Sequence, residues 1–380
     1  MKQRLLTPGP TPISPEVQEA MSRTLLYHRA AAFKEVVGRV REGLKWLFQT
    51  KTGEPLVLTC SGTGAMEGAF VNTLSRGDEI VCVRGGKFGE RWSNLAKAYG
   101  VTAVNVDVEW GKAVSVDAVK RALDEHPKAK GVFFQASETS TGVAHPVKAI
   151  AELCRARPDT LCVVDGISAL GVMNLPVDEW GIDILVGGSQ KAFMLPPGLA
   201  FVCLSPKALK AMEKSDLPKF YFSFAKELQS QQKGETAWTP AISLVMGLDE
   251  ALKQFRAEGL ERLFGRHKRL AEATRAGAKA MGLELLAPES PSDSVTAIKA
   301  PAGIDGQAVV KEMRDRHGIV IAGGQDALKG KIFRLSHMGW VDRFDILTAL
   351  SATGDVLTRL GAKVDVAAGI TAAEAVFRRE

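Results

Sequence analysis

The stretch that decides the fold runs from Leu161 to Ala200 and reads LCVVDGISALGVMNLPVDEWGIDILVGGSQKAFMLPPGLA. One apolar run, LCVV, ends in Asp165, and a second, IDILVGG, leads into Ser189, Gln190 and Lys191. Both runs are continuous rather than alternating, which is typical of strands in a parallel sheet that is covered on both faces. Functional groups in open α/β sheets lie at the carboxyl ends of such strands. We therefore expect Asp165 and Lys191 to emerge at the same edge of one sheet.

An acid and a lysine at one sheet edge suit pyridoxal phosphate as a cofactor. The lysine can form a Schiff base with the cofactor, and the acid can keep the pyridine nitrogen protonated so that the ring accepts electrons. An ordinary surface pair is the commoner arrangement of two such residues. Asp165 and Lys191 alone therefore do not establish a cofactor site, and the rest of the chain has to decide.

The bulk properties favour a soluble globular protein of two domains. At 380 residues the chain exceeds the size that one hydrophobic core usually supports. The net charge of +6 is mild and the basic residues are spread along helical segments, so no nucleic-acid surface is expected. No apolar run approaches the length of a membrane span, and the start of the chain does not resemble a signal peptide. The 5 cysteines form no CxxC pair, so we expect free thiols in a cytoplasmic protein without a metal site.

The first 20 residues are expected to form an N-terminal arm. The segment LLTPGPTPISP is too rich in proline to be helical, so it is either an extended arm or a lid. Ser14 followed by Pro15 is a good start for a short helix. A longer amphipathic helix is predicted from residue 32 to about residue 49.

A candidate phosphate site follows the next predicted strand, EPLVLTC. The sequence SGTGAMEG changes to helical spacing at small residues, and a helix that starts there presents free backbone N–H groups and positive potential to an anion. Ser61, Thr63 and the amides of Gly64 and Ala65 are the predicted ligands. A dinucleotide site is the competing interpretation, but the third glycine is misplaced for GxGxxG, and the next strand, EIVCVR, ends in arginine rather than in an acid.

Strands and helices alternate regularly through the middle of the chain. Strands are predicted at about 79–83, 102–107, 131–136, 161–165, 183–187 and 199–204, with helices near 88–99, 116–125 and 147–156. This βαβ rhythm predicts a parallel sheet with helices on both faces. We assign residues 21–250 to this large domain.

Two long amphipathic helices between about 241 and 281 are expected to lead into a smaller α+β domain, residues 251–380. Within it, Arg334 lies in the apolar strand FRLSHMG, where an arginine is costly unless it meets an anion. Its planar fork could bind a substrate carboxylate with two hydrogen bonds, whereas a structural ion pair is the alternative. His337 is expected to be a structural histidine.

The order of the motifs SGTGAME, GKFGER, ETSTG, VVDGISALG, GGSQKAF, TAWTP and FRLSHMG resembles that of the class V aminotransferases, which are pyridoxal phosphate enzymes of fold-type I. The resemblance covers nearly the whole chain and is greatest to the alanine–glyoxylate and serine–pyruvate (or serine–glyoxylate) branch. It implies an α/β fold in which a large domain, with a mostly parallel sheet covered by helices, carries a smaller α+β C-terminal domain.

The resemblance also implies a role for individual residues around the cofactor. Lys191 matches the Schiff-base lysine, Asp165 the acid on the pyridine nitrogen, and Gln190 a phosphate contact. The remaining implied cofactor contacts are Ile167 under the ring, Phe88 stacked on its other face, Thr139 near the ring hydroxyl, and Thr63, Gly64 and Ala65 in the phosphate loop. Some relatives have a histidine in place of Ala65.

Further residues are implied in substrate binding and in dimer formation. Arg334 matches the arginine that binds the α-carboxylate, and Gly9 and Ser140 match residues that line the substrate pocket. Thr236 and Thr239 match a segment that reaches the phosphate of the neighbouring subunit, so a homodimer with active sites at its interface is implied. Some relatives carry a tyrosine in this segment, and this chain does not.

The implied activity is a ping-pong transamination from alanine or serine to glyoxylate or pyruvate. A cysteine desulfurase is disfavoured, because the loop IAGGQDALKGK before Arg334 lacks a cysteine. An aminotransferase of the same family that uses 2-aminoethylphosphonate or aspartate stays open as an alternative. A non-enzymatic relative is disfavoured, because Asp165, Gln190, Lys191 and Arg334 are all present.

Overall fold

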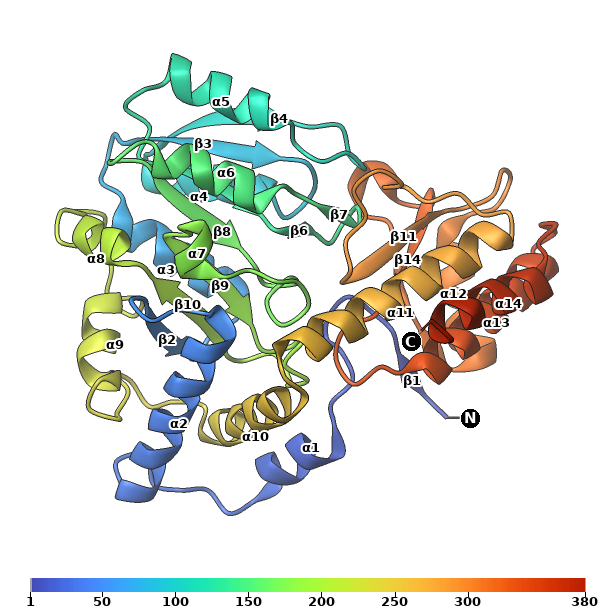
Figure 1. Cartoon of the computed structure of the whole chain (residues 1–380), viewed down its shortest axis with the longest axis horizontal. Helices are drawn as coiled ribbons and strands as arrows, with labels where there is room; N and C mark the ends of the chain where they lie inside the picture. Colours follow the sequence, from blue (N-terminus) through green and yellow to red (C-terminus); the bar gives the residue numbers. More distant parts are fainter. Residues whose placement is uncertain (1, 380) are drawn as a thin grey trace.

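The computed structural model describes residues 2–379, and its largest unit is a seven-stranded sheet (Figure 1). The strand order is β2-β10-β9-β8-β5-β3-β4. The strands are β2 (Glu54–Leu58), β3 (Glu79–Arg84), β4 (Thr102–Asp107), β5 (Gly131–Gln135), β8 (Leu161–Asp165), β9 (Ile184–Gly188) and β10 (Ala200–Leu204). The strands predicted for the large domain are therefore all present and share one sheet.

The sheet is mostly parallel, as the sequence predicts, but one strand departs from the prediction. β10 is antiparallel to both of its neighbours, β2 and β9. A parallel pair needs a long crossover, usually a helix, whereas the connection 189–199 contains none and lets the chain turn straight back. The prediction that 199–204 continues the parallel pattern was wrong for this reason, and Lys191 lies in that connection.

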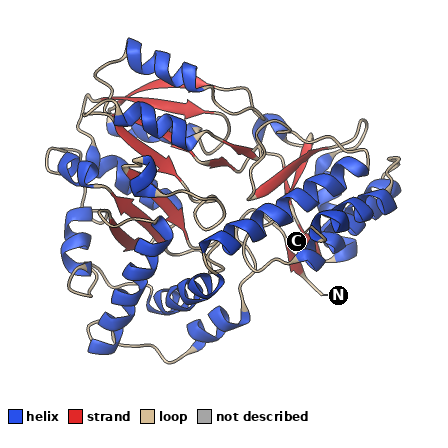
Figure 2. Cartoon of the chain, in the orientation of Figure 1, coloured by secondary structure: helices blue, strands red, loops and turns tan. Residues whose placement is uncertain are grey.

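Helices cover both faces of the sheet (Figure 2), and its strands are almost fully buried except for the edge strand β4. On one face lie α2 (Ala31–Phe48), α5 (Val116–Glu125), α6 (Val147–Arg155), α7 (Val177–Trp180) and α10 (Ile242–Glu258). On the other lie α3 (Gly62–Thr73), α4 (Glu90–Tyr99), α8 (Pro206–Met212) and α9 (Phe224–Gln231). Burial on both faces explains why the strand sequences are continuously apolar.

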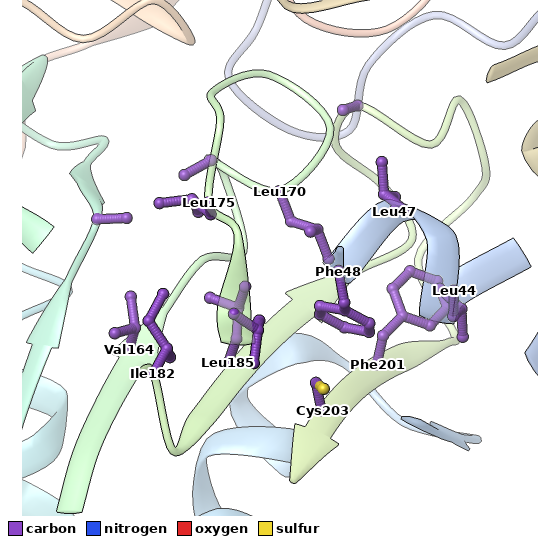
Figure 3. Packing of buried hydrophobic residues seen from close by; sticks show 14 of the residues in the cluster. Leu44, Leu47, Phe48, Val164, Leu170, Leu175, Ile182, Leu185, Phe201 and Cys203 are labelled. Carbon is purple, nitrogen blue, oxygen red and sulfur yellow. The ribbon is translucent and has the colours of Figure 1, made fainter. Parts of the chain in front are cut away.

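Alternate residues of each strand serve the two cores. Val164 of β8 packs in the first core with Leu185, Phe201 and Phe48 of α2 (Figure 3), whereas its neighbour Val163 packs in the second. A strand that feeds two cores is held in register from both sides, because a slip of one residue would exchange its two faces. Its carboxyl end, where the candidate site lies, is thereby fixed.

The C-terminal part of the chain forms a separate α+β unit around its own hydrophobic core. Its antiparallel sheet has the order β11-β14-β13. The elements are α11 (Leu260–Ala280), β11 (Val295–Lys299), α12 (Gly306–His317), β12 (Ile319–Val320), β13 (Ala322–Gly323), η1 (Asp326–Leu328), β14 (Ile332–Ser336), α13 (Arg343–Arg359) and α14 (Val366–Phe377). α11 runs between the two units (Figure 1). It contributes side chains both to this core and to that of the large sheet. The boundary at residue 250 stays a prediction.

The N-terminal arm joins the two units. Its first residues form β1 (Arg4–Leu5), which pairs in parallel with β12 of the small unit. The arm then crosses to the large unit, where α1 (Pro15–Ser22) begins at Ser14, whose side chain accepts a hydrogen bond from the Val17 N–H. The helix start predicted from Ser14 and Pro15 is confirmed. Within residues 2–379, no helix is both long enough and apolar enough to span a bilayer.

Candidate active site

Lys191 lies directly after β9, beneath the N-terminal arm. Its Nζ donates a hydrogen bond to the Pro8 carbonyl. The arm is held there by Thr11, whose N–H donates to Gln190 O at 3.2 Å and whose hydroxyl donates to Lys191 O at 2.6 Å. Burial lowers the pKa of Lys191 to about 8, with Asp165 opposing the shift and Arg334 and Arg91 adding to it. About half of the amine is thus neutral near pH 8, where most lysines are fully charged.

Asp165 ends β8 on the same edge of the sheet, as the strand pattern predicts. Its side chain is only 6% exposed, and its Oδ1 accepts a hydrogen bond of 2.8 Å from the Ile167 N–H. Burial raises the pKa of Asp165 to about 6, and the charge of Lys191 lowers it in return. The interpretation of Asp165 and Lys191 as an ordinary surface pair does not hold, because Asp165 is buried, Lys191 is half-buried beneath the arm, and each charge shifts the pKa of the other group.

The floor of this region is packed tightly around Ile167. A Cβ added at Gly62 would lie 2.5 Å from Cδ1 of Ile167, and one at Gly188 would lie 3.2 Å from both Ile167 Cγ2 and Gln190 Oε1. Ile167, the Gln190 amide and the start of α3 therefore converge on one place. The Gln190 Oε1 is buried and has no hydrogen-bond partner in the described chain.

The candidate phosphate loop forms the first turn of α3. The N–H groups of Gly64 and Ala65 both donate to Ser61 O, at 2.8 and 3.4 Å. The Thr63 hydroxyl accepts a hydrogen bond of 2.9 Å from Nη1 of Arg91. This arrangement places a cation and a helix N-terminus beside Thr63, which is favourable for an anion. The assignment of Thr63, Gly64 and Ala65 as phosphate ligands stays a prediction.

Phe88 lies in the loop that leads into α4, with its ring partly exposed. The guanidinium carbon of Arg91 lies 5.0 Å from the centre of this ring, a cation–π distance. The backbone N–H groups of Phe88 and Gly89 donate to the carboxylate of Glu138, at 3.1 and 2.9 Å. The backbone at Phe88 is therefore held by Glu138, and Arg91 lies over one face of its ring.

The loop after β5 carries Thr139 and Ser140. The Thr139 and Ser168 hydroxyls lie 2.7 Å apart. The Ser140 hydroxyl donates to Glu138 at 2.5 Å and accepts from the Lys87 N–H at 3.0 Å. Ser140 is completely buried, so its contacts within the chain give its predicted role as a substrate ligand no added support.

Arg334 on β14 is 4% exposed and makes no ion pair with a carboxylate among the described residues. Its Nη1 donates to Thr139 O at 2.8 Å, and its Nη2 donates to Gly323 O at 2.7 Å. Burial lowers the pKa of Arg334 to about 10. The structural ion pair considered from the sequence is therefore absent, and the cation has unmet affinity for an anion. His337 nearby is buried against Thr296 at 3.0 Å, and burial lowers its pKa to about 3, as expected of a structural histidine.

Three other predicted residues, Gly9, Thr236 and Thr239, lie in the arm and in the segment before α10. Gly9 lies against Lys191, because a Cβ there would come within 2.8 Å of Lys191 Cε. Thr236 and Thr239 lie in the segment before α10, where the Thr236 hydroxyl donates to Trp238 O at 2.6 Å. Within residues 2–379, no hydrogen bond joins either threonine to Lys191 or Gln190.

Sequence reasoning missed two charged residues that the structure brings to the site. Arg91 contacts Thr63 and Phe88, and Glu138 links Phe88 to Ser140. Both belong to motifs that the sequence analysis quoted, GKFGER and ETSTG, but charged residues in polar loops are usually solvated. The available signal was that each charge stands directly beside a predicted site residue.

Comparisons with known proteins agree with this geometry. Residues 5–341 match the family described as aminotransferase class-V. The chain is 43% identical to the soluble hydrogenase small subunit of Synechococcus, over 99% of this chain and 98% of that protein. It is 35% identical to the L-aspartate–glyoxylate aminotransferase of Paracoccus denitrificans, over 99% and 96%, and equally 35% identical to the serine–glyoxylate aminotransferase of Methylorubrum extorquens, over 99% and 96%. The crystal structure of ureidoglycine–glyoxylate aminotransferase from Bacillus subtilis superimposes with a TM-score of 0.93 at 30% identity, covering 100% of this chain and 99% of that one.

Proposed function

Because the chain belongs to the class V aminotransferases, we propose that it transfers the amino group of alanine or serine to glyoxylate or pyruvate, with pyridoxal 5′-phosphate as its cofactor. One observation carries the proposal. The charges of two buried residues, Asp165 and Arg334, both shift the pKa of the Lys191 amine. Arg334 makes no ion pair within residues 2–379. A lysine, an acid for the ring nitrogen and an arginine for a carboxylate are the groups that this chemistry requires.

The described residues fit the cofactor. The Gln190 amide lies beside the first turn of α3, where its NH₂ group and the helix N-terminus would both donate to a phosphate. Burial raises the pKa of the Asp165 carboxyl, and a cationic ring nitrogen beside it would lower this pKa again. Ile167 and Phe88 supply apolar surface for the two ring faces. When bound, pyridoxal phosphate supplies a carbonyl carbon that bonds to an amine and a ring that accepts an electron pair.

Lys191 is suited to move the substrate proton. A pKa of about 8 leaves a substantial fraction of the amine neutral at neutral to mildly alkaline pH. A neutral Nζ can take the α-proton of the amino donor and return it later, acting first as a base and then as an acid. The Pro8 carbonyl accepts a hydrogen bond from Nζ and directs it, and the arm above it limits access of water.

Arg334 sets the class of substrate. Its planar guanidinium is suited to bind one carboxylate, and in this structure it donates to two backbone carbonyls. The neighbouring Lys87 is already paired with Glu90 at 3.1 Å and with Asp326 at 2.5 Å. Arg91 also lacks an ion pair among residues 2–379, but it lies beside Thr63 at the proposed phosphate end, which leaves Arg334 for the substrate and favours a monocarboxylic amino acid. Aspartate and 2-aminoethylphosphonate stay as the alternatives to be tested.

A homodimer is part of the proposal, with active sites at the subunit interface. Its support is the family resemblance together with the exposed position of Thr239 in the segment that would reach the neighbouring phosphate. The amino acid and oxo acid substrates would then bind between the arm, Arg334 and this segment of the other subunit.

A screen of donors and acceptors tests the function. The protein loaded with pyridoxal phosphate is given alanine, serine or aspartate with glyoxylate or pyruvate, and the product amino acids are quantified. We expect glycine from glyoxylate with alanine or serine as donor, and no turnover with Lys191→Ala, which should also lose the visible absorption of the bound cofactor. A clear preference for aspartate would establish the alternative, and a loaded protein without transfer between any pair would overturn the proposal.

A further inference from the structure

Glu138 is a fully buried carboxylate in the middle of the candidate site, with no exposed surface. A buried charge is costly unless it is paired or well supplied with hydrogen bonds. No lysine, arginine or histidine in the described chain forms an ion pair with Glu138. Its oxygens instead accept from four donors of the protein, so its presence here requires a specific arrangement of the surrounding backbone.

These donors come from two separate segments. Oε2 accepts from Phe88 N at 3.1 Å and from Gly89 N at 2.9 Å. Oε1 accepts from Ser140 N at 3.1 Å and from the Ser140 hydroxyl at 2.5 Å. One oxygen therefore holds the loop of the ring-stacking Phe88, and the other holds the loop that carries Thr139 and Ser140.

The two segments approach so closely that a side chain would not fit between them. A Cβ added at Gly86 would lie 2.5 Å from both Cγ and Cδ of Glu138. The Ser140 hydroxyl, in turn, accepts from Lys87 N at 3.0 Å. The contact between the two loops is thus made through Glu138 and Ser140 and depends on a glycine at position 86.

The same loop also holds the substrate end of the site. Thr139, which follows Glu138, offers its carbonyl to Nη1 of Arg334 at 2.8 Å. The orientation of the Arg334 fork therefore depends on a carbonyl whose position is fixed by the hydrogen bonds of Glu138 and Ser140. Phe88 and Arg334 are therefore linked through one short segment, because Glu138 accepts from the Phe88 backbone and the next residue, Thr139, accepts from Arg334.

We propose that Glu138 is a positioning residue of the aminotransferase: its carboxylate fixes the ring of Phe88 relative to the fork of Arg334. The cofactor ring and the substrate carboxylate are thereby held in one geometry. This inference rests on the proposed function. Glutamine at this position has the same size, but its NH₂ group cannot accept hydrogen bonds, so the donors of one of the two loops lose their partner.

The test uses the full chain loaded with pyridoxal phosphate and compares Glu138→Gln with wild type. We expect kcat/KM for the amino donor to fall roughly 10- to 100-fold, the range for buried donors that lose their acceptor, mostly through a higher KM. The visible circular dichroism of the bound cofactor should weaken, because the ring loses its fixed stacking partner. Ser140→Ala removes one of the four donors, and we expect the same changes at smaller size. This second variant still tests the proposal if Glu138→Gln folds poorly.

Asp183→Asn is the matched control. Asp183 is also a buried carboxylate that accepts from a backbone N–H, that of Cys162 at 2.9 Å, and from a serine, Ser205 at 2.8 Å. It differs in lying at the opposite edge of the sheet and in an ion pair with Lys207 at 3.5 Å. We expect Asp183→Asn to lower stability while the donor KM and the visible circular dichroism stay as in wild type. If Glu138→Gln and Ser140→Ala behave like Asp183→Asn, the positioning role is wrong. If wild type transfers no amino group, the proposed function itself fails.

Discussion

At the scale of single residues, Asp165 lowers the stability of the folded protein in the ionised form that would bind the cofactor ring. Its carboxylate is buried, and its pKa rises from 3.8 to about 6, so the folded protein holds a proton there more tightly than the unfolded chain does. Stability from this group is complete below pH 4 and is lost as pH rises through about 6. Above that pH the buried carboxylate is ionised and destabilises the folded protein, and a cationic ring nitrogen would offset this cost.

Asp165→Asn should therefore stabilise the cofactor-free protein at pH 8. The change removes an ionised buried carboxylate, which corresponds to about 3 kcal/mol for the pKa shift, while asparagine keeps an oxygen for the Ile167 N–H. Urea unfolding at pH 8 and at pH 5 measures the effect, with the larger gain expected at pH 8. Affinity for pyridoxal phosphate should fall at the same time. An equal gain at both pH values would contradict the assigned cause.

The strand pattern predicted Asp165 and Lys191 because each follows a continuous apolar run, and such runs must end at one edge of a parallel sheet. It did not predict Glu138, because a glutamate next to threonine and serine has the composition of a solvated loop. Only the packing of two segments about 50 residues apart reveals that its oxygens are enclosed. Local sequence patterns indicate which residues of one helix or strand are buried. They do not indicate burial that arises from contacts between loops.

At the scale of elements, the N-terminal arm is the unusual feature. It is anchored in the small unit, where Ser336 N donates to Leu6 O at 2.9 Å, and again in the large unit, where Thr11 holds Gln190 and Lys191. Gly9 lies between the anchors with a φ of 140°, a conformation that other residues rarely adopt. The sequence predicted an extended arm from its prolines, but its second anchor beside Lys191 depends on tertiary contacts.

Gly9→Ala should displace the Lys191 side chain, because the new Cβ would lie 2.8 Å from its Cε and nearer still to its Nζ. We expect uptake of pyridoxal phosphate, followed by the growth of visible absorption, to slow at least about tenfold, as for a catalytic group moved from its place. Gly303→Ala is the control, since Gly303 has a φ of 79° and nothing within 4 Å of an added Cβ. Equal slowing in both variants would assign the effect to backbone strain rather than to the lysine.

At the scale of the whole molecule, the site is assembled from three parts of the chain. Lys191 and Asp165 come from the large sheet, Arg334 comes from the small one, and the arm ties both together. α11 runs from one core into the other, so the two units share a rigid connection (Figure 1). The sequence predicted both units from periodicity. The carbonyls that hold Arg334 belong to Thr139, in a turn, and to Gly323, in the two-residue strand β13, and both segments are too short to give a periodic signal.

An exposed aromatic cluster marks the surface where we expect the second subunit. Phe220 and Tyr221 are 72% and 42% exposed, and the Tyr221 ring stacks on Trp238 at 5.9 Å. Trp238 lies between Thr236 and Thr239, the residues proposed to reach the neighbouring phosphate. Exposed aromatic groups of this kind are typical of protein interfaces rather than of free surfaces.

Phe220→Asp should therefore weaken the dimer and, with it, the affinity for pyridoxal phosphate. A charge placed in an apolar interface loses its water without gaining a partner, which costs several kcal/mol per dimer, on the order of 100-fold or more in dissociation constant. Sedimentation equilibrium measures the dimer, and titration of the cofactor-free protein measures the affinity. Phe344→Asp is the control, since Phe344 is 59% exposed but lies on α13 of the small unit. A monomeric Phe220→Asp variant with unchanged cofactor affinity would show that each subunit holds its phosphate alone, and an intact dimer would place the interface elsewhere.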